Sequence, residues 1–116
     1  MPKEVKRGEI YWVDWNPARG SEQAGVRPAL VIQNDIGNKF SPTTIVCSFS
    51  TAIEKVYPFL VPVTANQSGL PKDSTINLSA IITIDKSRLR DKCGILDKDK
   101  MAEVDEAIKH SLALSK

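Results

Sequence analysis

The chain has 116 residues, which suits one domain and leaves no room for a second, so we expect residues 1–116 to form a single domain. Its 41% of hydrophobic residues is ordinary for a globular protein, and a net charge of +2 is too small to indicate a polyanionic partner by itself. The opening MPKEVKRGE has no apolar run of a signal peptide, and no stretch approaches the roughly 20 apolar residues that span a bilayer. These features predict a soluble cytoplasmic protein with no membrane partner.

Most of the chain is predicted to form short β-strands joined by polar loops. Seven segments are rich in aromatic, β-branched or other apolar residues and are predicted strands: 9–15, 28–33, 44–50, 59–64, 75–78, 80–84 and 92–95. Residues typical of turns predict loops at 18–26 and 34–42, and breaks at 65–72 and near Ser79.

The last segment has a different pattern. Asp97 is a good N-cap residue, and Met101, Val104, Ile108 and Leu112 follow at helical spacings of three, four and four. We therefore predict a helix over about residues 98–114. Six or seven short strands and one terminal helix indicate a mainly β fold, a small and strongly bent sheet or barrel.

The few histidines and cysteines exclude several kinds of site. His110 is the only histidine, so one subunit cannot supply both imidazoles of a paired-histidine ribonuclease, nor a three-histidine metal centre. Cys47 and Cys93 are isolated from each other in the sequence and are predicted to be reduced, partly buried thiols. The acidic residues are scattered. We expect no metal and no cofactor, and a solvated His110.

The loop GSEQAGVRP at 20–28 is the most unusual segment. Its glycines allow a ligand close to the backbone, and Ser21, Glu22 and Gln23 supply hydrogen-bonding groups. Arg27 begins the next strand, where its guanidinium can hold a phosphate through two parallel hydrogen bonds. From composition alone, an arginine paired with a nearby carboxylate is the simpler interpretation.

Two further groups of polar residues have both a functional and a structural interpretation. Ser50 and Thr51 end a predicted strand, and a hydroxyl beside Arg27 would suit a phosphoryl oxygen, although such residues are usually turn residues. Residues 85–92 contain four basic side chains that could attract a phosphate backbone, but the interrupting aspartates are more typical of a solvated surface.

Four aromatic residues lie in the predicted strands: Tyr11, Trp12, Trp15 and Phe49. Aromatic side chains can stack on nucleic-acid bases. Within strands they more commonly belong to the core, and we expect this of Trp12 and Phe49.

Taken together, these segments closely resemble the MazF/PemK-type toxins. RGEIYWVD at 7–14 and GSEQAGVRPALVI at 20–32 are similar to the opening of these toxins, and QNDIGNKFSPT at 33–43 resembles the subgroup of Gram-positive bacteria. TIDKSRL at 83–89 and VDEA at 104–107 fit as well. The resemblance covers nearly the whole chain, and the GSEQ-G-RP block at this distance from the first strand is highly specific.

The resemblance implies an SH3-like barrel of the MazF/PemK/CcdB toxin type that works as a homodimer. It implies a metal-independent endoribonuclease, an mRNA interferase, which cuts single-stranded RNA at specific sequences and thereby inhibits translation and growth. The ribose 2′-hydroxyl would attack the adjacent phosphorus and give a 2′,3′-cyclic phosphate and a free 5′-hydroxyl. A cognate antitoxin would neutralise the toxin by occupying the RNA groove.

The resemblance also assigns roles to residues. The catalytic arginine of the family falls on Arg27, where it would neutralise charge on the phosphoryl oxygens, and its hydroxyl partner falls on Ser50, with Thr51 adjacent. Glu22 matches a loop glutamate and is our candidate for the general base. Positions expected near the RNA are Arg7, Ser21, Gln23, Asn34, Tyr57 and Ser79.

Two departures from the family pattern affect these expectations. Ser50 stands where close relatives have threonine, which keeps the hydroxyl. Ser79-Ala80 replaces a Glu-Gln pair that can read base edges, so the RNA sequence cut by this chain is expected to differ from that of close relatives.

A second functional class stays open. Gyrase-poisoning toxins of the same fold bind a protein and cut nothing, and a barrel that serves as an adaptor is a third option. The gyrase poisons use an aromatic-bearing C-terminal end, whereas this chain ends SLALSK, which favours the nuclease.

Overall fold

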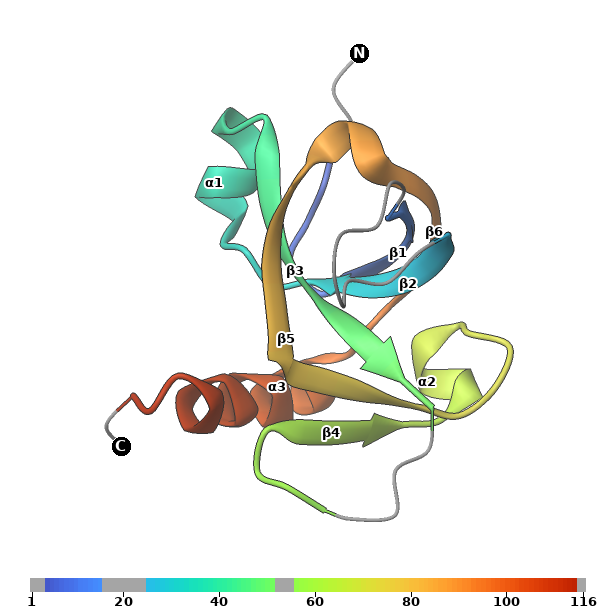
Figure 1. Cartoon of the computed structure of the whole chain (residues 1–116), viewed down its shortest axis with the longest axis vertical. Coiled ribbons are helices and arrows are strands. Elements are labelled where there is room, and N and C mark those ends of the chain that lie inside the picture. The colour runs from blue at the N-terminus through green and yellow to red at the C-terminus, as the bar shows by residue number, and fades with distance from the viewer. Residues whose placement is uncertain (1–3, 16–24, 52–55, 115–116) are drawn as a thin grey trace.

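The computed structural model describes residues 4–15, 25–51 and 56–114, and its main element is one strongly bent antiparallel sheet (Figure 1). Its six strands are β1 (Glu9–Asp14), β2 (Val26–Val31), β3 (Thr43–Ser50), β4 (Leu60–Val63), β5 (Ser74–Asp85) and β6 (Leu89–Ile95). They lie in the order β4-β5-β3-β2-β1-β6. The helical elements are α1 (Asp35–Phe40), α2 (Ala65–Ser68), the 3-10 turn η1 (Lys86–Arg88) and α3 (Lys98–Ser111). The predicted mainly β fold with a terminal helix is confirmed.

Alternating residues of the strands bury two apolar clusters, because successive side chains of a strand point to opposite faces. In β1, Ile10 belongs to a cluster that also contains Phe49 and the buried face of α3, whereas Tyr11 and Val13 belong to the other cluster. Trp12 packs against the first cluster and Phe49 lies within it, so the predicted core role of both is confirmed. The bend of the sheet thus gives each of its faces an apolar core.

Helix α3 begins as predicted and ends earlier. The Asp97 side chain accepts a hydrogen bond from the Lys100 backbone N–H at 2.8 Å, the expected N-cap interaction. Val104 is fully buried, and Met101 and Ile108 pack beside it. The helix ends at Ser111, and Leu112, predicted on the buried face, is 55% exposed.

Two segments predicted as loops contain helices, and the reason is side-chain capping. In α1, the Asn34 side chain accepts from the Gly37 N–H at 2.7 Å, while buried Asn38 accepts from the Thr44 hydroxyl at 2.7 Å. In α2, Thr64 and Gln67 form a capping box. The many turn-forming residues of these segments therefore predicted loops where the structure has two short capped helices.

Residues 74–85 form one strand and not the two that were predicted. The register between β3 and β5 shifts between the Cys47–Ile81 pair and the Ser48–Asn77 pair, so Ser79 lies in a bulge. On the N-terminal side of the bulge, residues 74–77 of β5 also pair with β4. Figure 1 shows β5 running along both halves of the bent sheet. The break near Ser79 is a bend within a continuous strand. Within the described ranges, no helix has both the length and the apolar character needed to cross a membrane.

Candidate active site

One cavity of about 410 Å³ brings together the two side chains that sequence analysis singled out for catalysis, Arg27 and Ser50, with Thr51. Its walls come from four parts of the chain: β1, the start of β2, the end of β3, and the turn between α2 and β5. The full lining is Trp12, Arg27, Pro28, Phe49, Ser50, Thr51, Leu70, Pro71, Lys72 and Ser74. Arg27 and Thr51 are exposed, and Ser50 is half-buried.

The pairing of β2 with β3 explains why Arg27 and Ser50 meet. Ala29 pairs with Ser48 in the antiparallel register of these strands. If this register continues by two residues in opposite directions, Arg27 lies across from Ser50 and on the same face. A cation and a hydroxyl that line one cavity can contact the same phosphate group.

The backbone around the GSEQ loop holds its two ends together beside Arg27. The Trp15 N–H donates to the Gly25 carbonyl at 2.9 Å, and Gly25 adopts a left-handed conformation (φ 78°) that favours glycine. Ser21, Glu22 and Gln23 lie outside the described residues. Their predicted roles therefore stay predictions.

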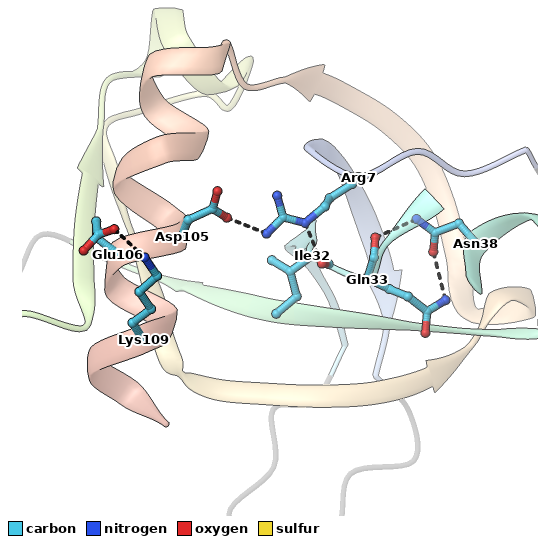
Figure 2. A network of polar contacts seen from close by, with 7 residues as sticks. All are labelled: Arg7, Ile32, Gln33, Asn38, Asp105, Glu106 and Lys109. Carbon is cyan, nitrogen blue, oxygen red and sulfur yellow. Dashed lines mark hydrogen bonds and ion pairs between the residues drawn. The ribbon is translucent and has the colours of Figure 1, made fainter. Parts of the chain in front are cut away.

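Two basic or amide residues expected near RNA have contacts elsewhere. The Arg7 guanidinium pairs with Asp105 of α3 at 2.7 Å and donates through Nε to the Ile32 carbonyl at 2.8 Å (Figure 2). Asn34 caps α1. Neither residue lines the cavity. In the structure both tie elements together, and their contact with RNA stays a prediction.

Tyr57 and Ser79, also expected near RNA, are exposed and do not line the cavity. The Tyr57 ring stacks on Phe59, with centroids 5.3 Å apart and planes 10° apart. The Ser79 hydroxyl donates to the Asn77 side-chain oxygen at 2.6 Å. Both are open to a ligand that extends beyond the cavity.

The basic run at 85–92 is held largely by the protein itself. Lys86 is buried and its ammonium donates to the Asn38 carbonyl, so the expectation of a solvated surface is wrong there. Arg90 pairs with Asp14 at 2.8 Å, and Lys92 pairs with Glu9 at 3.2 Å. These contacts oppose the use of the run as a phosphate-binding stripe.

Several groups that could act as nucleophile or base are held protonated by burial. Burial raises the pKa of the Cys47 thiol far above its ordinary value, and raises that of Cys93 as well. Burial, with a hydrogen bond to Glu9, also raises the pKa of the Tyr11 hydroxyl. The predicted reduced thiols and the exposed His110 are confirmed.

Metal-ligand side chains do not gather in the described part of the chain. No group of three or more His, Cys, Asp or Glu side chains there has an arrangement that could hold a metal ion. The cavity itself contributes a guanidinium, an ammonium and hydroxyls, which suit an anion.

Comparisons with known proteins identify the family of the chain. Residues 6–112 match the family of PemK-like, MazF-like toxins of type II toxin–antitoxin systems. Endoribonuclease EndoA of Bacillus subtilis (strain 168) is 54% identical over 111 residues, covering 95% of this chain and 96% of the relative.

Solved structures match the fold. A mycobacterial endoribonuclease in complex with its cognate antitoxin is similar with a TM-score of 0.81 and 21% identity, over 97% of this chain and 98% of that one. A MazE–MazF complex of Deinococcus radiodurans gives a TM-score of 0.77 at 25% identity, over 97% and 99%. The predicted toxin-type fold is therefore confirmed.

Proposed function

The chain belongs to the family of PemK-like, MazF-like toxins of type II toxin–antitoxin systems and is an endoribonuclease, and we propose that it cuts single-stranded RNA in the cavity around Arg27 and Ser50. Cleavage is specific for sequence, uses no metal and no other cofactor, and inhibits translation and growth. The endoribonuclease relative favours this function over the gyrase-poisoning alternative.

One observation carries the proposal of the site: Arg27 and Ser50, distant in sequence, line one cavity. An ion pair with a neighbouring carboxylate was the simpler expectation for Arg27. Its exposed side chain lines the same cavity as two hydroxyls, and this combination suits a phosphodiester, whose oxygens accept hydrogen bonds from both kinds of group.

In the proposed reaction the nucleophile is the RNA's own 2′-hydroxyl. Its oxygen forms a bond to the adjacent phosphorus, and its proton passes to a base, for which Glu22 is the candidate. The bond from phosphorus to the 5′-oxygen breaks, and that oxygen leaves with a proton, for which Arg27 is the candidate donor. Arg27 also neutralises charge on the phosphoryl oxygens, and Ser50 orients the phosphate.

Incubating the purified protein with a long natural RNA and sequencing the cut ends tests the function directly. We expect cuts at a short recurring sequence, with 5′-hydroxyl downstream ends. An intact RNA, or cuts without a common sequence, would contradict the proposal.

Ser50→Ala should lower the cleavage rate strongly, because the phosphate loses a positioned hydroxyl. Thr51→Ala is the matched control: it removes the neighbouring hydroxyl from the same cavity and should have the smaller effect. Single-turnover rates on one oligonucleotide compare the two. If Thr51→Ala were the more damaging change, the partner of Arg27 would be Thr51.

We expect the protein to be a homodimer, with each subunit contributing to the RNA groove. This expectation comes from the family resemblance. Light scattering at micromolar concentration should give about twice the subunit mass of 12.8 kDa. A mass near that of one subunit would contradict it.

A cognate antitoxin should inhibit by covering the cavity, and we expect its inhibitory segment to be acidic and partly disordered, to complement Arg27. Hydrogen exchange or footprinting of the complex should show protection around Arg27 and Ser50. An inhibited complex in which RNA still reaches Arg27 would argue against this mode.

A further inference from the structure

The turn between α2 and β5 forms a wall of the cavity that sequence analysis missed. Leu70, Pro71 and Lys72 of this turn line the cavity together with Arg27 and Ser50. Glycine, proline and aspartate at residues 69–73 are typical of an ordinary connection, so their composition does not indicate a ligand. Lys72 is the second cationic side chain of the cavity.

The backbone that carries Lys72 is fixed from both sides. The Asp73 carboxylate accepts the Ala65 N–H at 2.7 Å, and the Leu70 N–H donates to the Ser68 hydroxyl at 3.1 Å. The Ser74 hydroxyl donates to the carbonyl of Lys72 itself at 3.2 Å. Leu70 is buried in the core, which anchors the start of the turn.

The turn also rests directly on β6. A Cβ atom on Gly69 would lie 2.1 Å from the Cys93 carbonyl oxygen, and one on Gly94 would lie 2.1 Å from the Ser68 carbonyl oxygen. Gly69 has a φ of 80°, a conformation that favours glycine. Two glycines thus allow the backbones to approach closely, which holds the turn against the sheet.

Among the described residues, no carboxylate forms an ion pair with the Lys72 ammonium. The neighbouring Asp73 carboxylate is engaged with the Ala65 N–H instead. The side chain is exposed while its backbone is rigid, which is the arrangement expected of a cation that meets a ligand at the cavity mouth.

We propose that Lys72 is a positioning residue that binds a phosphate of the RNA strand while Arg27 acts at the scissile one. This inference rests on the proposed function, since it names a second contact of the same site. Lysine acts as a compact point charge, so it holds the strand without the two-point geometry of arginine. Its loss should weaken binding and leave the chemical step almost unchanged.

The test uses an RNA oligonucleotide with one mapped cut site and a 2′-deoxy sugar 5′ to the cut, which the enzyme should bind without cutting. Lys72→Gln should raise the dissociation constant about threefold to fivefold at low salt, as expected for an exposed charge contact. It should also reduce the slope of log affinity against log salt by about 0.7, the value for one phosphate of a single strand. Lys72→Arg should bind within about twofold of wild type.

Lys98→Gln is the matched control, because Lys98 is exposed at the start of α3 and does not line the cavity. It should bind as the wild type does. With cleavable RNA at saturation, the rate of Lys72→Gln should stay within about threefold of wild type, since the contact is made equally in the ground and transition states.

Three results separate the possible failures. If Lys72→Gln has the affinity and salt slope of Lys98→Gln, or if its saturated rate falls with binding unchanged, the role of Lys72 is wrong and the proposed function stands. If wild type cuts no RNA, the proposed function itself is wrong. Thermal unfolding of Lys72→Gln should match wild type, because the substitution lies on an exposed side chain.

Discussion

Arg27→Ala should reduce RNA cleavage by about 100- to 1000-fold or more, because a preorganised charge beside the developing phosphorane is usually the largest single catalytic contribution. The side chain is exposed at the start of β2, so its removal leaves the core intact. We expect the free energy of unfolding to change by no more than about 0.5 kcal/mol, as for other surface substitutions. Single-turnover cleavage and thermal unfolding measure the two effects separately.

Arg90→Ala is the matched control for this experiment. Arg90 is also an exposed arginine on a strand, but it pairs with Asp14 and lies outside the cavity. Its removal should leave cleavage close to wild type. Near wild-type cleavage by Arg27→Ala would mean that the cavity is not the catalytic site.

Replacing the 2′-hydroxyl by hydrogen at the nucleotide 5′ to the cut should abolish cleavage there, because the nucleophile is then missing. Excess chelator, in contrast, should leave the rate on ordinary RNA unchanged, since the cation of the proposed mechanism is Arg27. The upstream fragment should end in a 2′,3′-cyclic phosphate, which mass spectrometry identifies. Single-stranded DNA of the same sequence should not be cut.

The opposite result would be informative. Loss of activity in chelator, or hydrolysis of the deoxy-substituted strand, would mean that water is the nucleophile. A second RNA with the 2′-deoxy sugar one nucleotide further upstream is the matched control and should be cut normally.

The regular parts of the fold could be predicted because their signals are local. Aromatic and β-branched runs marked β1 to β3, and Asp97 followed by Met101 and Val104 marked α3. What could not be predicted depends on partners distant in sequence. Helix α1 is stabilised by Asn38, whose buried side-chain oxygen accepts a hydrogen bond from the Thr44 hydroxyl of β3. No local sequence pattern predicts that contact.

The candidate site divides in the same way. Arg27 and Ser50 could be named from their family positions, and strand order then made their meeting plausible. Lys72 could not be named, since it lies in a turn whose composition looks ordinary and whose place beside Arg27 arises only from the packing of α2 on β6. Lys86 shows the reverse: a lysine in a basic run is buried because α1 offers it the Asn38 carbonyl.

The glycine contact between α2 and β6 has a consequence for genetic screens of this toxin. A selection for survivors that tolerate expression should recover side-chain substitutions at Gly94, although no atom of that strand residue faces the cavity. Such a substitution pushes the Ser68 carbonyl away and tilts the whole turn that carries Leu70 and Lys72. Survivors at Gly94 would then mark an indirect lesion of the cavity wall, and a map of inactivating positions would extend to β6, an edge strand that does not line the cavity.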